Sequence, residues 1–158
     1  MSEPLAEQIM KRVKQAAELY HRLLLVVVPA GAGKTAALHD VRDRTGAPLV
    51  NVNLELSRQM LELTERQRAL HLPRLLREIV GNGGGEMILL DNIEVIFDID
   101  LKQDPLRLLQ GLSRNKTVVA AWSGSIVGDS LTYAAPDHQE YRRYPIRDFL
   151  VASPELTT

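Results

Sequence analysis

The feature that most constrains the fold is an unbroken apolar run at 23–28 followed by a glycine-bearing loop, which together contain the stretch VVVPAGAGKT. Such an apolar run predicts a strand buried on both faces of a parallel sheet. A tight loop that ends in Lys34-Thr35 and opens a helix turns backbone N–H groups and the helix N-terminus toward an anion. The stretch therefore predicts a phosphate-binding loop between a first strand and a helix that runs from Lys34 to about Arg44.

The usual phosphate-loop pattern, G-x-x-x-x-G-K-[ST], begins with glycine, whereas this sequence has Val28 at that position. The leading glycine lets the chain leave the strand, and Val28 can do the same if its φ stays negative. Lys34 is expected to reach the β- and γ-phosphates, and the Thr35 hydroxyl is expected to bind Mg²⁺. The residues predicted to bind the nucleotide are Pro29, Ala30, Gly31, Ala32, Gly33, Lys34 and Thr35.

Hydrophobic spacing predicts the remaining elements. We expect an amphipathic helix at 4–22, a strand at 49–53, and two helices within 54–80 that are separated near Pro73. A glycine-rich loop at 81–85 precedes a buried strand at 87–91, and Asp104 is a predicted N-cap for a helix at 105–112. Further strands are expected at 117–122, 131–133 and 149–151.

Strands that alternate with helices predict an α/β fold with a parallel sheet flanked by helices. We predict one P-loop NTPase domain over 1–158, with an AAA+-like or RecA-like core. Its parts are an N-terminal amphipathic helix at 1–22, an α/β core at 23–151 and a tail at 152–158. A chain of 158 residues leaves no room for a separate helical lid domain.

An acidic residue at the end of a neighbouring apolar strand is the second requirement of a nucleotide hydrolase. Asp91 follows the strand 87–90 and is predicted to hold Mg²⁺, through a water molecule. Many ATPases have a glutamate directly after this aspartate, whereas this chain has Asn92 there and Glu94 two positions later. Asn92 can orient the attacking water but cannot take its proton, so Glu94 is the predicted catalytic base.

Two further residues are assigned to the site. Ser123 directly follows the strand predicted at 117–122. This strand is expected to lie between the phosphate-loop strand and the acidic strand, so Ser123 can contact the γ-phosphate. Arg114 follows a helix and is predicted to complete the site of a neighbouring subunit. The adenine is expected near Tyr20 and His21 or at such a neighbour, and Trp122 is expected in the core.

The formal net charge of −1 and the absence of cysteine limit the other functions. No global positive field attracts nucleic acid, so a DNA contact would be local or supplied by a partner. Arginines at 66–77 and at 142–143 are candidate patches for such a contact, or solvated surface. No thiolate metal site, disulfide, secretory signal or membrane span is expected, so we predict a soluble, cytoplasmic protein without a membrane partner.

Three runs in this chain resemble the BrxF family, the small P-loop proteins of type 3 BREX phage-defence systems. They are NVNLELSRQMLELTERQR from Asn51, ILLDNIEVIFD from Ile88 and LKQDPLRLLQGLSRNKTVVAAW from Leu101. The resemblance covers nearly the whole chain, although Val28 replaces the glycine that commonly begins the family's loop. It implies the phosphate-loop assignments, the role of Asp91, and defence against phage beside a methyltransferase, a phosphatase-like protein and a large ATPase.

We therefore predict an ATP- and Mg²⁺-binding component of a BREX system. It is a slow or partner-stimulated ATPase that uses Mg·ATP to control its assembly with other defence proteins, and a homo-oligomer is an open alternative to a monomer. A non-hydrolysing, nucleotide-dependent scaffold is the competing hypothesis, favoured by Asn92, and a DNA-binding module is the third.

Overall fold

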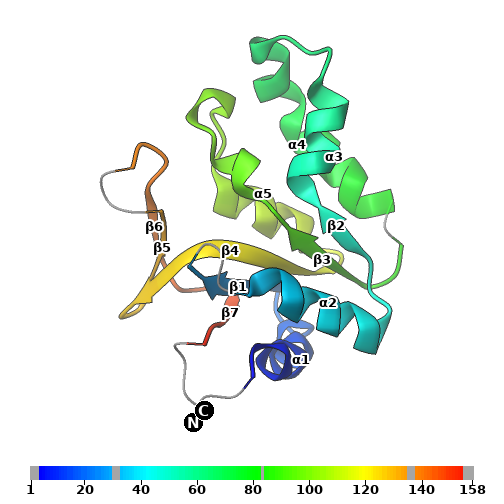
Figure 1. Cartoon of the computed structure of the whole chain (residues 1–158), viewed down its shortest axis with the longest axis vertical. Coiled ribbons are helices and arrows are strands. Elements are labelled where there is room, and N and C mark those ends of the chain that lie inside the picture. The colour runs from blue at the N-terminus through cyan, green and yellow to red at the C-terminus, as the bar shows by residue number, and fades with distance from the viewer. Residues whose placement is uncertain (1–3, 30–32, 83, 135–137, 155–158) are drawn as a thin grey trace.

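The computed structural model describes residues 4–29, 33–82, 84–134 and 138–154 (Figure 1). The helices are α1 (Leu5–Ala16), α2 (Lys34–Thr45), α3 (Val52–Met60), α4 (Glu65–Asn82) and α5 (Pro105–Leu112), with two 3-10 helices, η1 (Glu94–Phe97) and η2 (Ile99–Leu101). The strands are β1 (Leu23–Val28), β2 (Leu49–Asn51), β3 (Met87–Asp91), β4 (Thr117–Val127), β5 (Ser130–Tyr133), β6 (Arg142–Pro145) and β7 (Leu150–Ala152).

The sheet is mostly parallel, with the strand order β2-β3-β4-β1-β7. Every neighbouring pair in this order is parallel, whereas β5 pairs with β4 and β6 pairs with β5 in antiparallel fashion. The predicted α/β class with a parallel sheet flanked by helices is confirmed. As expected, β4 lies between β1, which precedes the predicted phosphate loop, and β3, which ends at Asp91.

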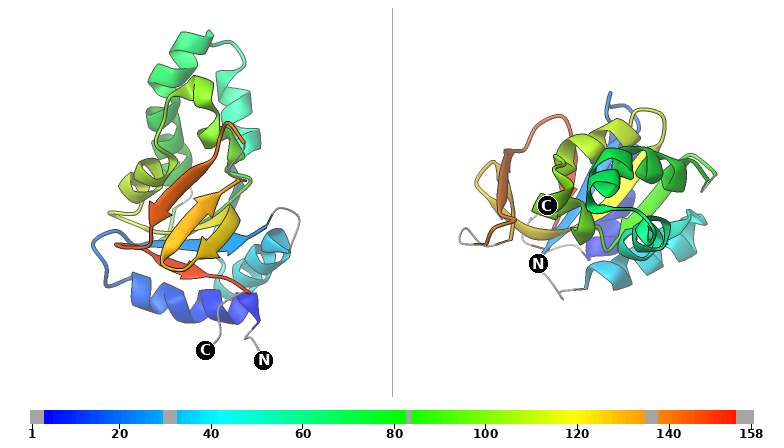
Figure 2. Two further views of the ribbon diagram at one scale, coloured as in Figure 1. Left: turned by 90° about the vertical axis from the view of Figure 1, so that its left-hand side faces the viewer. Right: turned by 90° about the horizontal axis from the view of Figure 1, so that it is seen from above.

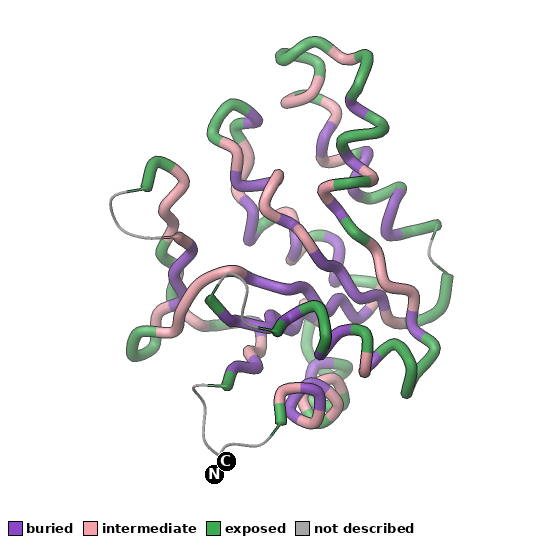
Figure 3. Tube along the Cα trace, in the orientation of Figure 1, coloured by how far each residue is buried: buried purple, intermediate pink, exposed green. Residues whose placement is uncertain are grey.

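The central strands are apolar throughout because both faces of the sheet are covered. Successive side chains of a strand point to opposite faces. The odd-numbered residues of β1 belong to a cluster that includes residues of α3, α4 and α5, and the even-numbered residues to one that includes residues of α1 and α2. All six residues of β1 are buried, and the buried positions concentrate around the sheet in Figure 3.

The two helices predicted within 54–80 are separated at residues 61–64, between α3 and α4, and not near Pro73. Pro73 lies inside α4. A proline has no N–H for the carbonyl four residues earlier, which here belongs to Ala69. The side-chain amide of Gln103 donates to that carbonyl at 2.8 Å, so the lost backbone bond is replaced and the helix continues.

Other boundaries also differ from the sequence predictions. The first helix ends at Ala16 instead of Arg22, and the second strand ends at Asn51, whose side chain caps α3 by accepting from the Leu54 N–H. β7 runs one residue beyond the predicted core. β4 continues to Val127, five residues past the predicted end, and β6 was not predicted at all.

The extra length of β4 builds a small antiparallel sheet that projects from the main one (Figure 2). β4, β5 and β6 form this extension, and one of its faces packs on the core through aromatic rings. Tyr133 stacks on Phe97 with ring centroids 3.5 Å apart, and Trp122 contacts Phe97, Tyr133 and Tyr144 edge-on. Trp122 is fully buried, which confirms its predicted place in the core.

None of the helices among the described residues combines the length and apolar composition that a membrane crossing requires.

Candidate functional site

Most of the predicted site residues gather where β1 and β3 end and where β4 leaves the parallel sheet. Val28, the last residue of β1, is paired with Ser123 of β4, and Asp91 is the last residue of β3. Parallel strands end at the same edge of a sheet, and open α/β sheets bind ligands outside that carboxyl edge. Residues distant in the sequence are thus brought to one place by the strand order alone.

The predicted phosphate loop joins β1 to α2 at this edge, and Ala30, Gly31 and Ala32 lie outside the described residues. Val28 is in a strand and its φ is not positive, so the condition set for replacing glycine is met. Gly33 is the N-cap of α2 and has a φ of 92°, a conformation that strongly favours glycine. Both described ends of the loop therefore have the backbone that a tight turn into a helix requires.

Thr35 and Asp91, the two predicted Mg²⁺ ligands, are in direct contact. Thr35 Oγ1 donates a hydrogen bond to Asp91 Oδ2 at 2.6 Å, although the two residues are 56 positions apart. Asp91 is buried, with a relative exposure of 6%, and Thr35 is exposed. Lys34, which precedes Thr35 in the sequence, is buried, with a relative exposure of 8%. A buried carboxylate and an exposed hydroxyl therefore meet at the start of α2, where Lys34 is also buried.

This arrangement fits Mg²⁺. The ion binds oxygen at about 2.0–2.1 Å in octahedral geometry, so two adjacent ligands lie about 2.9 Å apart. The Thr35 and Asp91 oxygens are 2.6 Å apart, so an ion bound by the Thr35 hydroxyl would lie within reach of the Asp91 carboxylate, either directly or through one of the ion's water ligands as predicted. Water and phosphate oxygens commonly supply the remaining ligands of such an ion.

Within the described part of the chain, no group of three or more His, Asp or Glu side chains is placed to hold a metal. A magnesium ion that is shared with a bound phosphate needs only one or two protein carboxylates, so the pair of Thr35 and Asp91 matches that kind of site.

The turn after Asp91 carries the two predicted catalytic residues. Asn92 has a φ of 52°, in the left-handed region that asparagine tolerates better than most residues, and its N–H donates to Asp91 Oδ1 at 2.9 Å. Asn92 thus holds the Asp91 carboxylate through its backbone. Glu94 follows as the first residue of η1 and is half-buried.

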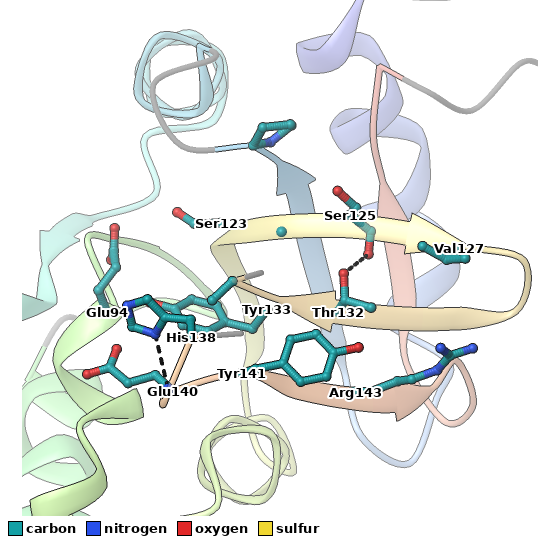
Figure 4. Close-up of a pocket in the computed structure, with 13 residues that line it drawn as sticks. Glu94, Ser123, Ser125, Val127, Thr132, Tyr133, His138, Glu140, Tyr141 and Arg143 are labelled. Carbon is teal, nitrogen blue, oxygen red and sulfur yellow. Dashed lines mark hydrogen bonds between the residues drawn. The ribbon is translucent and has the colours of Figure 1, made fainter. Parts of the chain in front are cut away.

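Glu94 lines a cavity of about 780 Å³ together with Pro29 and Ser123 (Figure 4). Three of the predicted site residues, which are distant in the sequence, therefore face one space at the edge of the sheet. The cavity continues along the antiparallel extension, where it is also lined by Val127, Thr132, Tyr133, Tyr141 and Arg143.

Tyr133 forms part of the cavity wall next to Glu94. Burial raises the pKa of Tyr133, and the carboxylates of Glu94 and Glu140 raise it further. The phenol therefore stays protonated well above neutral pH. Its ring is fixed by stacking on Phe97.

The part of the cavity formed by β5 and β6 was missed because the extension was not predicted. The turn between β4 and β5 consists of Gly128 and Asp129, and Gly128 has a φ of 62°. A Gly-Asp pair between two short runs in which polar and apolar residues mix is a hairpin signal, so this part of the site was accessible to sequence reasoning.

Arg114 lies at the opposite edge of the sheet. It precedes Thr117, the first residue of β4, whereas Ser123 is six residues further along the strand, about 20 Å away at the usual rise. Arg114 therefore cannot reach the site of its own chain. Its assignment to the site of a neighbouring chain stays a prediction.

Tyr20 and His21 share this opposite edge because they precede β1. The Arg114 guanidinium lies 5.1 Å from the centroid of the Tyr20 ring, and the Tyr20 and His21 rings are in edge-on contact. The expectation that Tyr20 and His21 hold the adenine of a nucleotide bound by their own chain is therefore wrong.

The two arginine-rich runs are partly occupied by contacts within the chain. In α4, Arg74 pairs with Glu78 at 3.2 Å. In β6, Arg142 donates to the Gln103 carbonyl at 3.0 Å, whereas Arg143 lines the cavity. Tyr144 donates to Asp104 at 3.0 Å, and burial together with that carboxylate raises the pKa of Tyr144. Arg142 and Tyr144 are thus engaged on the core side of β6.

Comparison of the sequence with models of known protein families finds no match, and a search of curated proteins finds none that is significantly similar.

Proposed function

We propose that this chain is a P-loop NTPase domain that binds Mg·ATP at the carboxyl edge of its sheet. The observation that carries the proposal is the 2.6 Å hydrogen bond between Thr35 and Asp91, since these are the hydroxyl and the carboxylate that such a site uses for Mg²⁺. Buried Lys34 at the start of α2 supplies the cation for the β- and γ-phosphates.

The strand order supports the same assignment. β4 lies between β1 and β3 in the sheet. Ser123 of β4 is paired with Val28, the last residue of the phosphate-loop strand β1, and therefore lies between the ends of β1 and the acidic strand β3. In this arrangement Ser123 contacts the γ-phosphate. An AAA+-like or RecA-like core is the architecture that we propose.

For hydrolysis, Glu94 is the proposed base. It accepts a proton from the attacking water, whose oxygen bonds to the γ-phosphorus as the bond to the β-phosphate oxygen breaks and ADP leaves. The support is that Glu94 shares its cavity with Ser123 and Pro29. We expect slow turnover, because Glu94 lies two positions after the place that the glutamate of many ATPases occupies, and Asn92, which stands at that place, cannot accept a proton.

Stimulation by a partner is supported by the size of the cavity. One attacking water needs only about 10–15 Å³ of such space, whereas the cavity measures about 780 Å³. Side chains of a second protein therefore have room beside Glu94 and Ser123. With the resemblance to BrxF, this supports a role in which Mg·ATP controls assembly with other BREX components in phage defence.

The competing proposal is a scaffold that binds ATP without hydrolysing it, and Asn92 directly after Asp91 is the feature that favours it. A DNA-binding module has less support, since Arg74 and Arg142 are engaged within the chain. Filter binding of DNA across a range of salt concentrations tests this last proposal, and no retention at low salt would remove it.

ATP affinity and phosphate release, measured on the wild-type chain and two variants, test the main proposal. Lys34→Ala is expected to weaken ATP binding at least tenfold, because a charge-assisted contact to phosphate is lost. Glu94→Gln is expected to bind ATP like the wild type and to lose at least 10²-fold in turnover. Unchanged turnover in Glu94→Gln would refute the base assignment, and binding without turnover in the wild type would favour the scaffold.

A further inference from the structure

The turn that carries Glu94 is held at both ends by one residue of another element, Asn53. The backbone N–H of Asn53 donates to the carbonyl of Asn92 at 2.8 Å. The side-chain Oδ1 of Asn53 accepts a hydrogen bond from the N–H of Val95 at 2.9 Å. The two bonds therefore flank Ile93 and Glu94.

Asn53 reaches this turn because β2 and β3 end side by side. Asn51, the last residue of β2, is paired with Asp91, and α3 begins directly afterwards at Val52. The first N–H groups of a helix have no partner inside the helix, so the N–H of Asn53 is available for the Asn92 carbonyl. Its half-buried side chain is then directed at Val95.

Two further restraints act on the same turn. Ile93 is buried, with a relative exposure of 1%, and belongs to the core cluster that contains α3 and α4. Asn92 has the left-handed backbone that bends the chain after Asp91. Glu94 is thus carried on a short segment that is fixed before and after it, while its own side chain faces the cavity (Figure 4).

We propose that Asn53 is a positioning residue for Glu94: its side chain holds the Val95 N–H and so fixes the distance between the Glu94 carboxylate and the γ-phosphate. This inference rests on the proposed ATPase function. A misplacement of about 1 Å can cost about 10²-fold in rate, so the loss of this single contact is expected to reduce turnover without reducing ATP affinity.

The test compares the wild-type chain with Asn53→Ala, Asn53→Asp and Asn51→Ala. Asn53→Ala removes the acceptor, whereas Asn53→Asp keeps an oxygen at the same position. Asn51→Ala is the matched control, because its side chain also accepts a helix N–H, that of Leu54 at 3.1 Å, but does not touch the turn. For each variant we would measure ATP affinity, the maximal rate of phosphate release, and hydrogen exchange at residues 92–97.

The expected result is a 10- to 100-fold lower maximal rate for Asn53→Ala with ATP affinity within about twofold of the wild type. Faster exchange at 92–97 should accompany it, and Asn53→Asp should restore most of the rate. The Asn51→Ala chain should keep the wild-type rate.

Wild-type turnover in Asn53→Ala, or an equal loss in Asn51→Ala, would overturn the positioning role and leave the proposed ATPase intact. Unchanged exchange at 92–97 in Asn53→Ala would overturn it as well. Absence of turnover in the wild-type chain would refute the ATPase proposal itself, and with it any role of Asn53 toward Glu94.

Discussion

At the scale of single residues, Gly124 shows how closely the antiparallel extension is fitted to the main sheet. A Cβ at this position would lie 1.8 Å from the carbonyl oxygen of Thr132 and 2.9 Å from Nε1 of Trp122. These two atoms are themselves joined by a buried hydrogen bond of 2.9 Å. Only glycine therefore fits where β4 passes from the parallel sheet into the extension.

We predict that Gly124→Ala lowers the free energy of unfolding by about 2–4 kcal/mol, because it overpacks the core and separates a buried donor from its acceptor. Gly111→Ala is the control, since a Cβ there meets nothing within 4 Å and alanine favours the helix α5 by about 0.5–1 kcal/mol. Urea denaturation measures both. Similar stability of the two variants would contradict the close approach.

Site residues could be predicted from the sequence where their position depends only on which strand they follow. Thr35 and Asp91 were assigned as a pair because a phosphate loop and an acidic strand share one edge, and the structure joins them at 2.6 Å. Asn53 was not found, because its contact with Val95 links positions 42 apart and depends on where β2 ends. No local sequence pattern indicates a contact of this kind.

At the scale of elements, α4 begins with a reciprocal cap, and this cap explains why α3 and α4 are separate helices that meet at residues 61–64. The Thr64 hydroxyl accepts from the Gln67 N–H at 3.2 Å, and the Gln67 side chain accepts from the Thr64 N–H at 2.9 Å. This is the capping box, whose pattern of Ser or Thr followed three residues later by Glu or Gln is present in the sequence. Pro73 suggested a break more strongly, but Gln103 satisfies the carbonyl that Pro73 leaves free.

Thr64→Ala is predicted to cost about 1 kcal/mol of unfolding free energy, because the first turn of α4 loses an N-cap. The measurement is again urea denaturation, with Ser57→Ala as the control, since Ser57 is exposed inside α3. A loss in Ser57→Ala as large as that in Thr64→Ala would indicate that the cap contributes nothing specific.

At the scale of the whole molecule, the two ends of the parallel strands carry different chemistry. The carboxyl edge holds Asp91, Glu94 and the cavity, whereas the amino edge holds Arg114 beside Tyr20, whose relative exposure is 69%. If the amino edge of one chain met the carboxyl edge of the next, the contact would join two different surfaces and would form a ring or a filament. The sequence-based prediction placed Arg114 in a neighbour's site, and its position at the amino edge excludes a role in the site of its own chain, so the role in a neighbour's site stays a prediction.

Mixing two inactive variants tests this arrangement. Arg114→Ala keeps its own phosphate site but has no arginine to donate, and we expect a loss on the order of 10³-fold in turnover. Lys34→Ala has no working site but keeps Arg114. In a mixed head-to-tail assembly with equal amounts of both, half of the chains have a working site and half of their neighbours supply the arginine, so about a quarter of wild-type activity should return. Light scattering verifies the size of the assembly with ATP present, and each variant alone is the control. Mixed assemblies without recovered activity, or full turnover in Arg114→Ala alone, would show that the arginine does not act across an interface.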